Sequence, residues 1–371
     1  MNPRRQSRRI VRYAVVGLGH IAQDAVLPAF AHAGRNSRLV ALVSGDARKR
    51  RELARRHDAT AYDYDEYDSL LASGVVDAVY LALPNDRHRD FAVRAARRGV
   101  HVLCEKPLAV TAREAEAMVR ACRRHGVRLM TAYRLHLEPA TRHAMDLVRA
   151  GRIGEPRLFT STFTMRVKDA GNIRMRDWDA GGGPLHDIGI YCINAARNLF
   201  DAEPVEVAAF ATAPVRGAAP ASVVAHLRFP RERLASFAVS FDAADVSEYR
   251  IVGTGGSILA EPAYEYAEGL SLVVRRGSRV RRRHWPKSDQ FAPELLHFSD
   301  CIVAGRDPQP SGEEGVADLR VIEALHRAAR TGRRVRLAAA PKRRPARPVA
   351  PIVRPAIPRP PRLVNATPPS A

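Results

Sequence analysis

Between Arg12 and about Tyr133, short apolar runs alternate with longer stretches whose apolar residues recur every three or four positions. The short runs predict buried strands at 12–17, 38–44, 76–83, 100–105 and 127–133. The longer stretches predict helices, one of which starts after Thr111 as its cap and ends at Gly126. Because strands that alternate with helices form parallel sheets covered on both faces, we expect a doubly wound α/β domain.

After about residue 155 the pattern changes to successive short strands separated by turn residues. One long helical pattern, 184–199, interrupts them, and a final helix is predicted at 311–332 with Ser311 as its cap. This combination is typical of an α+β domain with a largely antiparallel, open sheet. We therefore divide the chain into a basic N-terminal tail, a nucleotide-binding domain, a substrate and oligomerisation domain, and a C-terminal tail, at 1–11, 12–134, 135–336 and 337–371.

The 371-residue chain carries a formal net charge of +21, and much of that charge lies at its ends. Residues 1–12 hold five arginines and no acid, and residues 340–371 hold seven basic residues, ten prolines and no acid. Such composition predicts a disordered, solvated C-terminal tail. Weak, salt-sensitive contact of the tails with nucleic acid or anionic membranes is the less favoured alternative.

The chain has neither a run of eighteen apolar residues nor the pattern of a signal peptide, so we expect a cytoplasmic protein without a membrane span. The cysteines show no metal-ligand spacing, which predicts reduced, mostly buried thiols and no metal site. They are Cys104, Cys122, Cys192 and Cys301.

The stretch GLGHIA, 17–22, follows the first predicted strand and opens a helix. It is the GxGxxA form of the dinucleotide-binding fingerprint. Gly17 permits the tight turn, and Gly19 lets the backbone approach a pyrophosphate at the helix N-terminus.

The end of the second predicted strand bears on the choice between NADP and NAD. The strand ends at Ser44, followed by GDARKR. A serine can hydrogen-bond a 2′-phosphate, and Arg48, Lys49 or Arg50 can neutralise it, which favours NADP. Asp46 points the other way if it binds the ribose hydroxyls of NAD; its alternative role is to cap the next helix.

Two further stretches follow predicted strands at the edge where ligands bind in such sheets. They are LPNDRH, 83–88, and CEKP, 104–107. A buried Lys106 beside a nicotinamide could hold a substrate hydroxyl and tune a neighbouring acid or base. The alternative for Glu105 and Lys106 is a surface ion pair.

The stretch GGGPLHDIGIY, 181–191, carries two polar side chains four residues apart on a predicted helix. Asp187 and Tyr191 therefore share one face. The glycines would let the chain pass close beside a cofactor or substrate, and Pro184 suits the first turn of the helix.

Together these motifs, with YAVVGLGHIA, HVLCEKPLAV and LMTAYRLHLEP, resemble the glucose–fructose oxidoreductase/inositol dehydrogenase/MocA (Gfo/Idh/MocA) family over about residues 12–335. They are most similar to its glucose–fructose oxidoreductase-like branch. The resemblance implies a Rossmann domain followed by an α+β domain whose open sheet forms a homo-oligomer interface. It also implies hydride transfer between a nicotinamide cofactor and a sugar, polyol or related carbonyl.

The resemblance assigns catalytic roles to Lys106, Asp187 and Tyr191; many members of the family have a histidine at the position of Tyr191. It places Ser44 and Lys49 at the 2′-phosphate of NADP. The full set of predicted cofactor-binding residues is Gly17, Gly19, His20, Ile21, Ser44, Lys49, Leu83, Pro84, Asn85, His88, Glu105, Lys106, Tyr133 and Arg134.

We therefore predict an NADP-dependent oxidoreductase in which Tyr191 exchanges a proton with a sugar or polyol hydroxyl. His136, His186 and Arg176 are further polar candidates for the wall of the pocket. One alternative is a glucose–fructose oxidoreductase-type transhydrogenase with tightly bound NADP. The other is a catalytically idle NADP-binding protein with interaction tails, but an idle site has no chemical need for all three catalytic residues.

Overall fold

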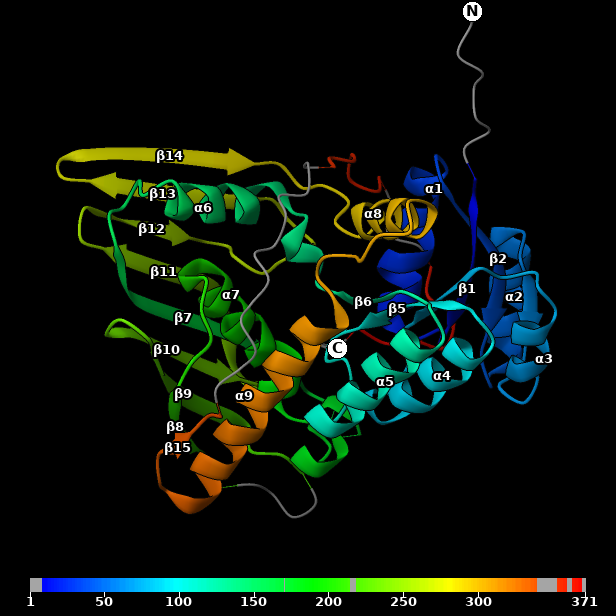
Figure 1. Ribbon diagram of the computed structural model, residues 1–371, viewed down its shortest axis with the longest axis horizontal. Coiled ribbons are helices and arrows are strands. Elements are labelled where there is room, and N and C mark those ends of the chain that lie inside the picture. Colours follow the sequence, from blue (N-terminus) through cyan, green and yellow to red (C-terminus); the bar gives the residue numbers. More distant parts are fainter. Residues whose placement is uncertain (1–8, 170, 214–217, 339–351, 359–361, 369–371) are drawn as a thin grey trace, which may run out of the picture.

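The computed structural model describes residues 9–169, 171–213, 218–338, 352–358 and 362–368. These residues form two sheets that lie side by side, with helices around and between them (Figure 1). The predicted N-terminal tail falls, up to residue 8, outside the described residues.

The first sheet is parallel throughout and has the strand order β3-β2-β1-β4-β5-β6. The order reverses at β1, which confirms the doubly wound prediction and puts the ligand crevice at the carboxyl ends of β1 and β4. Only the short β3 was missing from the predicted strands. The strands are β1 (Val11–Val16), β2 (Ser37–Val43), β3 (Thr60–Tyr62), β4 (Ala78–Leu81), β5 (His101–Glu105) and β6 (Leu129–Ala132).

Apolar side chains alternate between the two faces of this sheet, as expected for buried strands. In β1, Ala14 and Val16 pack with α3, α4 and α5, whereas Tyr13 and Val15 pack with α1 and α2 on the opposite face. A π-helical segment, Ala22–Val26, leads into the first helix. The helices are α1 (Leu27–Ala33), α2 (Ala47–His57), α3 (Tyr67–Ala72), α4 (Asn85–Arg97) and α5 (Ala112–Arg124). Thr111 caps α5 as predicted.

The second sheet is mostly antiparallel, which confirms the predicted α+β class. Its order is β14-β13-β12-β11-β7-β10-β9-β8-β15, and only the β7–β10 pair is parallel. The strands are β7 (Pro156–Arg166), β8 (Glu206–Ala211), β9 (Ser222–Phe229), β10 (Arg233–Ser240), β11 (Asp242–Gly253), β12 (Gly256–Ala260), β13 (Leu270–Arg276), β14 (Arg279–Trp285) and β15 (Val335–Arg336).

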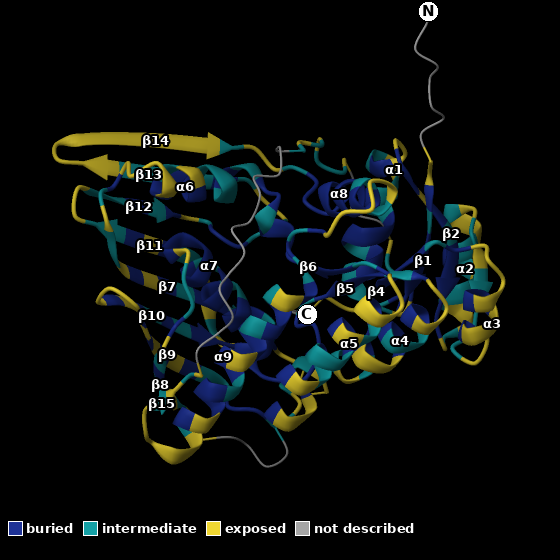
Figure 2. Ribbon diagram, viewed as in Figure 1, coloured by how far each residue is buried: buried dark blue, intermediate teal, exposed yellow. Residues whose placement is uncertain are grey.

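Helices cover one face of the second sheet, and the edge strand β14 is exposed along most of its length (Figure 2). They are α6 (Pro139–Arg149), α7 (Ile190–Phe200) and α9 (Gly312–Thr331). Short 3-10 turns lie at Arg134–His136, Ile173–Met175 and Trp178–Ala180. The predicted helix at 184–199 begins as a π-helical segment, Leu185–Gly189, that runs into α7.

One helix from the C-terminal half of the chain packs on the first sheet. In α8 (Ala292–Val303), the Ser299 hydroxyl shares hydrogen bonds with the Tyr13 and Ser37 hydroxyls, each 2.7 Å long. The stretch that was assigned to the substrate domain thus completes the nucleotide-binding half. The sequence pattern does not show this, because most residues of α8 are buried and their pattern does not tell which sheet the helix packs against.

Part of the predicted disordered C-terminal tail is ordered, which corrects the prediction for residues 352–358 and 362–368. Pro355 forms a bridge with Ser288, and Val364 is only 3% exposed in the core beside α1 and α2. Residues 339–351, 359–361 and 369–371 lie outside the described part.

Candidate active site

A cleft of about 430 Å³ lies at the carboxyl ends of the first sheet and continues to the second sheet. Twelve of the predicted cofactor-binding residues line it, together with Asp187 and Tyr191. Those twelve are Gly17, Gly19, His20, Ile21, Ser44, Lys49, Leu83, Pro84, Asn85, Glu105, Lys106 and Arg134.

The glycine turn at one end of the cleft has the form that a dinucleotide pyrophosphate requires. Gly17 has a φ of 89°, and a Cβ there would lie 2.5 Å from the Ala82 carbonyl oxygen, so only glycine fits. A Cβ at Gly19 would meet nothing within 4 Å, so the space beside its backbone is open. These residues fit a bound dinucleotide, with its pyrophosphate at the start of the following helix.

The loop after β2 places the candidate 2′-phosphate ligands on the wall of the cleft. Ser44 is buried there, and Lys49 lies half-buried on the first turn of α2. Asp46 does not line the cleft; its Oδ1 accepts hydrogen bonds from the backbone N–H groups of Arg48 and Lys49. Asp46 therefore caps α2, which is the second of the two roles that the sequence left open.

Lys106 and Asp187 meet across the cleft although they are 81 residues apart in the chain. The Lys106 Nζ donates to Asp187 Oδ1 at 3.0 Å and to the Asp187 carbonyl oxygen at 2.8 Å. Burial lowers the pKa of Lys106, but the nearby carboxylate of Asp187 outweighs it and holds the pKa above its ordinary value. The pair is thus an internal ion pair of the site rather than the surface pair Glu105–Lys106.

Arg174 holds the other oxygen of the Asp187 carboxylate. Its Nε donates to Oδ2 at 2.6 Å. Burial pushes the pKa of Asp187 upward, but Lys106 and Arg174 outweigh it and hold the pKa far below its ordinary value, so the group remains an anion.

Arg174 was not among the predicted site residues, because the stretch 168–178 carries no recognisable motif. The chain turns sharply there: a Cβ at Gly182 would lie 1.9 Å from the Arg176 carbonyl oxygen, and the Gly183 N–H donates to the Arg174 carbonyl oxygen at 2.6 Å. The triple glycine thus lets the Arg174 segment fold against the start of the helix that carries Asp187. Three consecutive glycines beside an arginine-rich stretch were the only available signal.

Two cations face the ring of Tyr191. The Lys106 Nζ lies 4.7 Å from the ring centre, and the Arg134 guanidinium carbon lies 5.2 Å from it. Burial lowers the pKa of Arg134, but Tyr191 and Glu265 hold it above its ordinary value. Both are cation–π contacts, which place two positive charges beside the Tyr191 ring.

Glu105 lies under this cluster and is nearly fully buried. Its Oε1 accepts a hydrogen bond of 2.7 Å from the Tyr80 hydroxyl. Burial raises the pKa of its carboxyl, against the lowering effect of that hydrogen bond and of Lys106. The buried Glu105 therefore ties the end of β5 to Tyr80, while the Lys106 side chain crosses the cleft to Asp187.

The structure places two predicted cofactor residues away from the wall of the cleft. The His88 ring is fully buried and bonds the carbonyl oxygens of Leu83 and Pro107, so it ties together the two loops that follow β4 and β5. The Tyr133 hydroxyl donates to Asp318 on α9. Both side chains thus lie outside the lining of the cleft and bond groups that support its walls.

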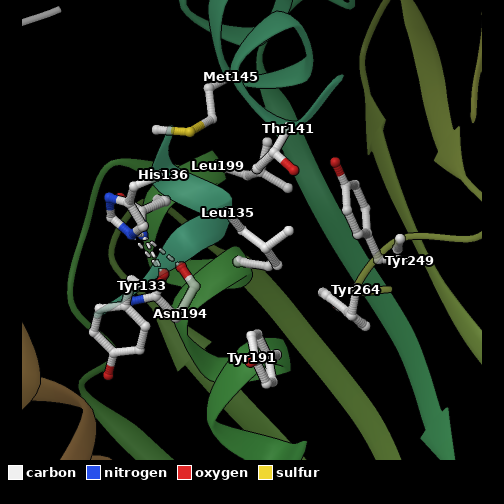
Figure 3. A pocket seen from close by; sticks show the side chains of 13 residues that line it. Tyr133, Leu135, His136, Thr141, Met145, Tyr191, Asn194, Leu199, Tyr249 and Tyr264 are labelled. Atoms are coloured by element: carbon white, nitrogen blue, oxygen red, sulfur yellow. Dashed lines mark hydrogen bonds between the residues drawn. The ribbon is translucent and has the colours of Figure 1, made fainter. Parts of the chain in front are cut away.

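The three remaining polar candidates, Arg176, His186 and His136, each lie close to or bond with other protein groups. Arg176 lines the cleft but is exposed, 3.7 Å from Asp86. His186 is buried, with its ring nitrogens against the carbonyl oxygens of Gly182 and Val110. His136 and Tyr191 both line an apolar cavity of about 30 Å³, and the His136 Nε2 bonds Asn194 at 2.7 Å (Figure 3).

The cysteines are buried, as predicted. Across the described ranges, we find no cluster of three or more His, Cys, Asp or Glu side chains that could hold a metal ion. In the same part of the chain no helix combines the length and the apolar surface that a membrane crossing needs.

Two family models match the chain. Residues 11–133 match the Gfo/Idh/MocA oxidoreductase family, NAD-binding Rossmann fold, and residues 141–259 match the Gfo/Idh/MocA C-terminal domain. The two matches meet near the predicted division at residues 134 and 135, although the division itself stays a prediction.

Three related proteins match over most of the chain. An NADP(+) D-xylose 1-dehydrogenase of Haloarcula marismortui is 33% identical over 88% of this chain and 93% of its own. An aldose–aldose oxidoreductase from Caulobacter crescentus, known from its crystal structure, is 37% identical in sequence to this chain. The TM-score between the two structures is 0.84, and the match covers 89% of this chain and all of the other. A 3-ketoreductase from Actinomadura kijaniata, solved with NADP and TDP-benzene, is 27% identical, with a TM-score of 0.78 over 86% and 98%. The family matches confirm the resemblance seen in the sequence: this chain is an oxidoreductase of the Gfo/Idh/MocA family.

Proposed function

We propose that this protein is an NADP-dependent oxidoreductase that interconverts a secondary alcohol and a carbonyl on a sugar or polyol. The observation that carries the proposal is the meeting of Lys106, Asp187 and Tyr191 in the same cleft as the glycine turn. The D-xylose dehydrogenase and aldose–aldose oxidoreductase relatives support a sugar as the substrate class.

The bound nicotinamide would accept or supply the hydride. The protein must then exchange the hydroxyl proton and stabilise the charge that develops on the substrate oxygen. Tyr191 is the proposed proton-exchanging group, since it lines the cleft and has Lys106 and Arg134 against its ring.

Lys106 would act on the substrate oxygen as a fixed positive charge. Its ammonium is anchored by two hydrogen bonds to Asp187, which leaves one N–H directed elsewhere. Asp187, anchored in turn by Arg174, acts as a positioning residue that keeps Lys106 charged and in place.

NADP rather than NAD is proposed because of the loop after β2. Ser44 and Lys49 line the cleft, whereas Asp46, the one acid that could bind the ribose hydroxyls of NAD, caps α2. The relatives named above as NADP-dependent or solved with NADP support the same choice.

The test is a screen of the purified protein with NADP(H) and NAD(H) against a panel of aldoses, ketoses and polyols. We expect turnover with at least one member and a higher kcat/KM with NADP(H). Absence of turnover over the whole panel, from protein that binds NADP, would favour the catalytically idle alternative.

A second candidate is a reaction between two sugars on one retained NADP. The similarity to an aldose–aldose oxidoreductase favours it. Protein purified without added cofactor would then carry NADP and convert a mixture of two aldoses into an aldonolactone and a polyol. Dependence on added NADP would exclude this reaction.

For the oligomeric state, we propose that the outer face of the second sheet pairs with another copy of the chain. Large apolar side chains are exposed there on adjacent strands, with Leu158 beside Leu234 and Phe210 beside Val224. Light scattering on the wild type and on Leu234→Glu tests this, since the variant should dissociate. A monomeric wild type would rule it out.

A further inference from the structure

Residues 362–368, the C-terminal segment, return to the nucleotide-binding half and attach to the glycine turn. The Gln23 carboxamide accepts from the Val364 N–H at 2.7 Å and donates to the Val364 carbonyl at 2.9 Å. The same amide nitrogen donates to the Leu18 carbonyl at 2.8 Å. Gln23 is 1% exposed and Val364 3%, so the attachment is part of the core.

The C-terminal segment also attaches to the loop after β2. Asn365 Nδ2 donates to Asp46 Oδ2 at 3.1 Å, on the oxygen that the helix cap leaves open. The Arg56 side chain, on α2, donates to the Arg362 carbonyl oxygen at 2.7 Å. The segment thus joins the two loops that would hold the pyrophosphate and the 2′-phosphate.

No residue of the C-terminal segment lies among those that line the cleft, whereas both loops it joins do. We infer that the C-terminal segment is a positioning element for the 2′-phosphate side of the NADP site, and that it acts through Asn365 on Asp46. This inference rests on the proposed choice of NADP.

The physical reason is that the Asp46 carboxylate, if nothing held it, would disfavour NADP. A carboxylate at the end of β2 repels a 2′-phosphate and binds ribose hydroxyls instead. Asn365 and the cap together occupy both oxygens of Asp46, so the carboxylate is held by the start of α2 and by the C-terminal segment. The backbone N–H of Asp46 in turn donates to the Ser44 hydroxyl oxygen at 3.2 Å, which leaves the hydroxyl proton available for a phosphate.

The coupling must work in both directions. If a docked segment raises the affinity for NADP, then bound NADP must by the same factor favour the docked segment. Arg362 begins the C-terminal segment and is followed by Leu363, so trypsin would cut this bond when the segment detaches, whereas Arg354 precedes a proline and resists cleavage. NADP should therefore slow cleavage there, and NAD should do so much less.

The experiment compares the full-length wild type with Asn365→Gly. Glycine is chosen because Asn365 has a φ of 44°, where alanine would be strained. Thr367→Ala, an exposed position in the same segment, is the matched control. The readouts are the Kd of NADP and of NAD by calorimetry, and the rate of tryptic cleavage with each cofactor.

We expect Asn365→Gly to weaken NADP binding about fivefold, as for loss of one exposed charge-assisted contact, with the Kd of NAD unchanged or lowered. Thr367→Ala should match the wild type. In an Asp46→Ser background, which keeps a capping hydroxyl, the effect of Asn365→Gly should disappear, because its target is gone. Equal loss for both cofactors, or a full effect in the Asp46→Ser background, would overturn the inference.

The outcomes also separate this inference from the proposed function. A wild type that binds NAD more tightly than NADP would refute the proposed cofactor. A wild type that prefers NADP, with Asn365→Gly binding both cofactors as the wild type does, would refute only the role of the C-terminal segment.

Discussion

The two ends of the cleft are built in different ways. The cofactor end consists of turns that directly follow strands, so residues close in sequence meet there, such as Gly17 with Gly19 and Ser44 with Lys49. The substrate end brings Lys106 from the end of β5 together with Asp187 and Tyr191 from the π-helical segment and the start of α7, in the other half of the molecule. Damage at the cofactor end should therefore change binding, whereas damage at the substrate end should change the chemical step.

The largest effect is expected for Tyr191→Phe. The ring stays in place against Phe163, 5.8 Å away between centres, but the proton-exchanging hydroxyl is lost. Since general acid–base groups contribute about 100- to 10,000-fold, we expect kcat to fall about 1,000-fold. Steady-state kinetics measures this, and calorimetry should give an unchanged Kd for NADP.

Tyr264→Phe, which removes a buried hydroxyl bonded to Ser161, is the control. A variant with normal kcat would take Tyr191 out of the mechanism.

Lys106→Met should come next. The apolar chain fills the same space, but the charge that faces Tyr191 and the substrate oxygen is removed, and we expect kcat to fall about 100-fold. Single-turnover kinetics with bound NADPH reports the chemical step directly.

A double-mutant cycle with Asp187→Asn sharpens this prediction. If Asp187 acts by holding Lys106, the second substitution should cost little once Lys106 is absent. Full additivity of the two effects would show that Asp187 contributes to the reaction without Lys106.

A smaller effect is expected for Arg174→Gln. Arg174 touches Asp187 rather than the reacting groups, and its side chain is 27% exposed, so we expect kcat/KM to fall about tenfold, less than a buried charged hydrogen bond would give. Arg176→Gln, two residues away and facing Asp86 at 3.7 Å, is the matched control. A loss of kcat/KM in Arg174→Gln but not in Arg176→Gln would show that the hydrogen bond from Arg174 to Asp187 contributes to the reaction. Equal losses in both would point to general disturbance of the loop.

The sequence could predict most of the cofactor end because its information is local. The GxGxxA turn and the serine after β2 each lie within a few residues of a strand whose apolar pattern is plain. The partnership of Lys106 with Asp187 could be inferred only through the family resemblance, since spacing places both Asp187 and Tyr191 on one helical face without saying what faces them.

Arg174 and the C-terminal segment could not be predicted, because their roles come from contacts between distant parts of the chain. Nothing around Arg174 distinguishes it from Arg176, and the difference arises only where the glycine turn folds its segment onto Asp187. Val364 lies in a stretch whose prolines and charges predict disorder, and that composition does not show its buried side chain or its two backbone hydrogen bonds to Gln23.

The smallest effect is expected at the cofactor end, from Lys49→Ala. The ammonium is half-buried at the start of α2, where a contact with a 2′-phosphate would be worth about 1 kcal/mol, or about a fivefold increase in the Kd of NADP. Arg48→Ala removes an equal charge that is paired with Glu52 outside the cleft, so it should leave the Kd unchanged. Fluorescence titration with NADPH and NADH distinguishes the two variants, and kcat at saturating NADPH should stay normal in both. A loss of kcat in Lys49→Ala would break the division between the two ends, because it would show that a residue of the binding end also acts in the chemical step.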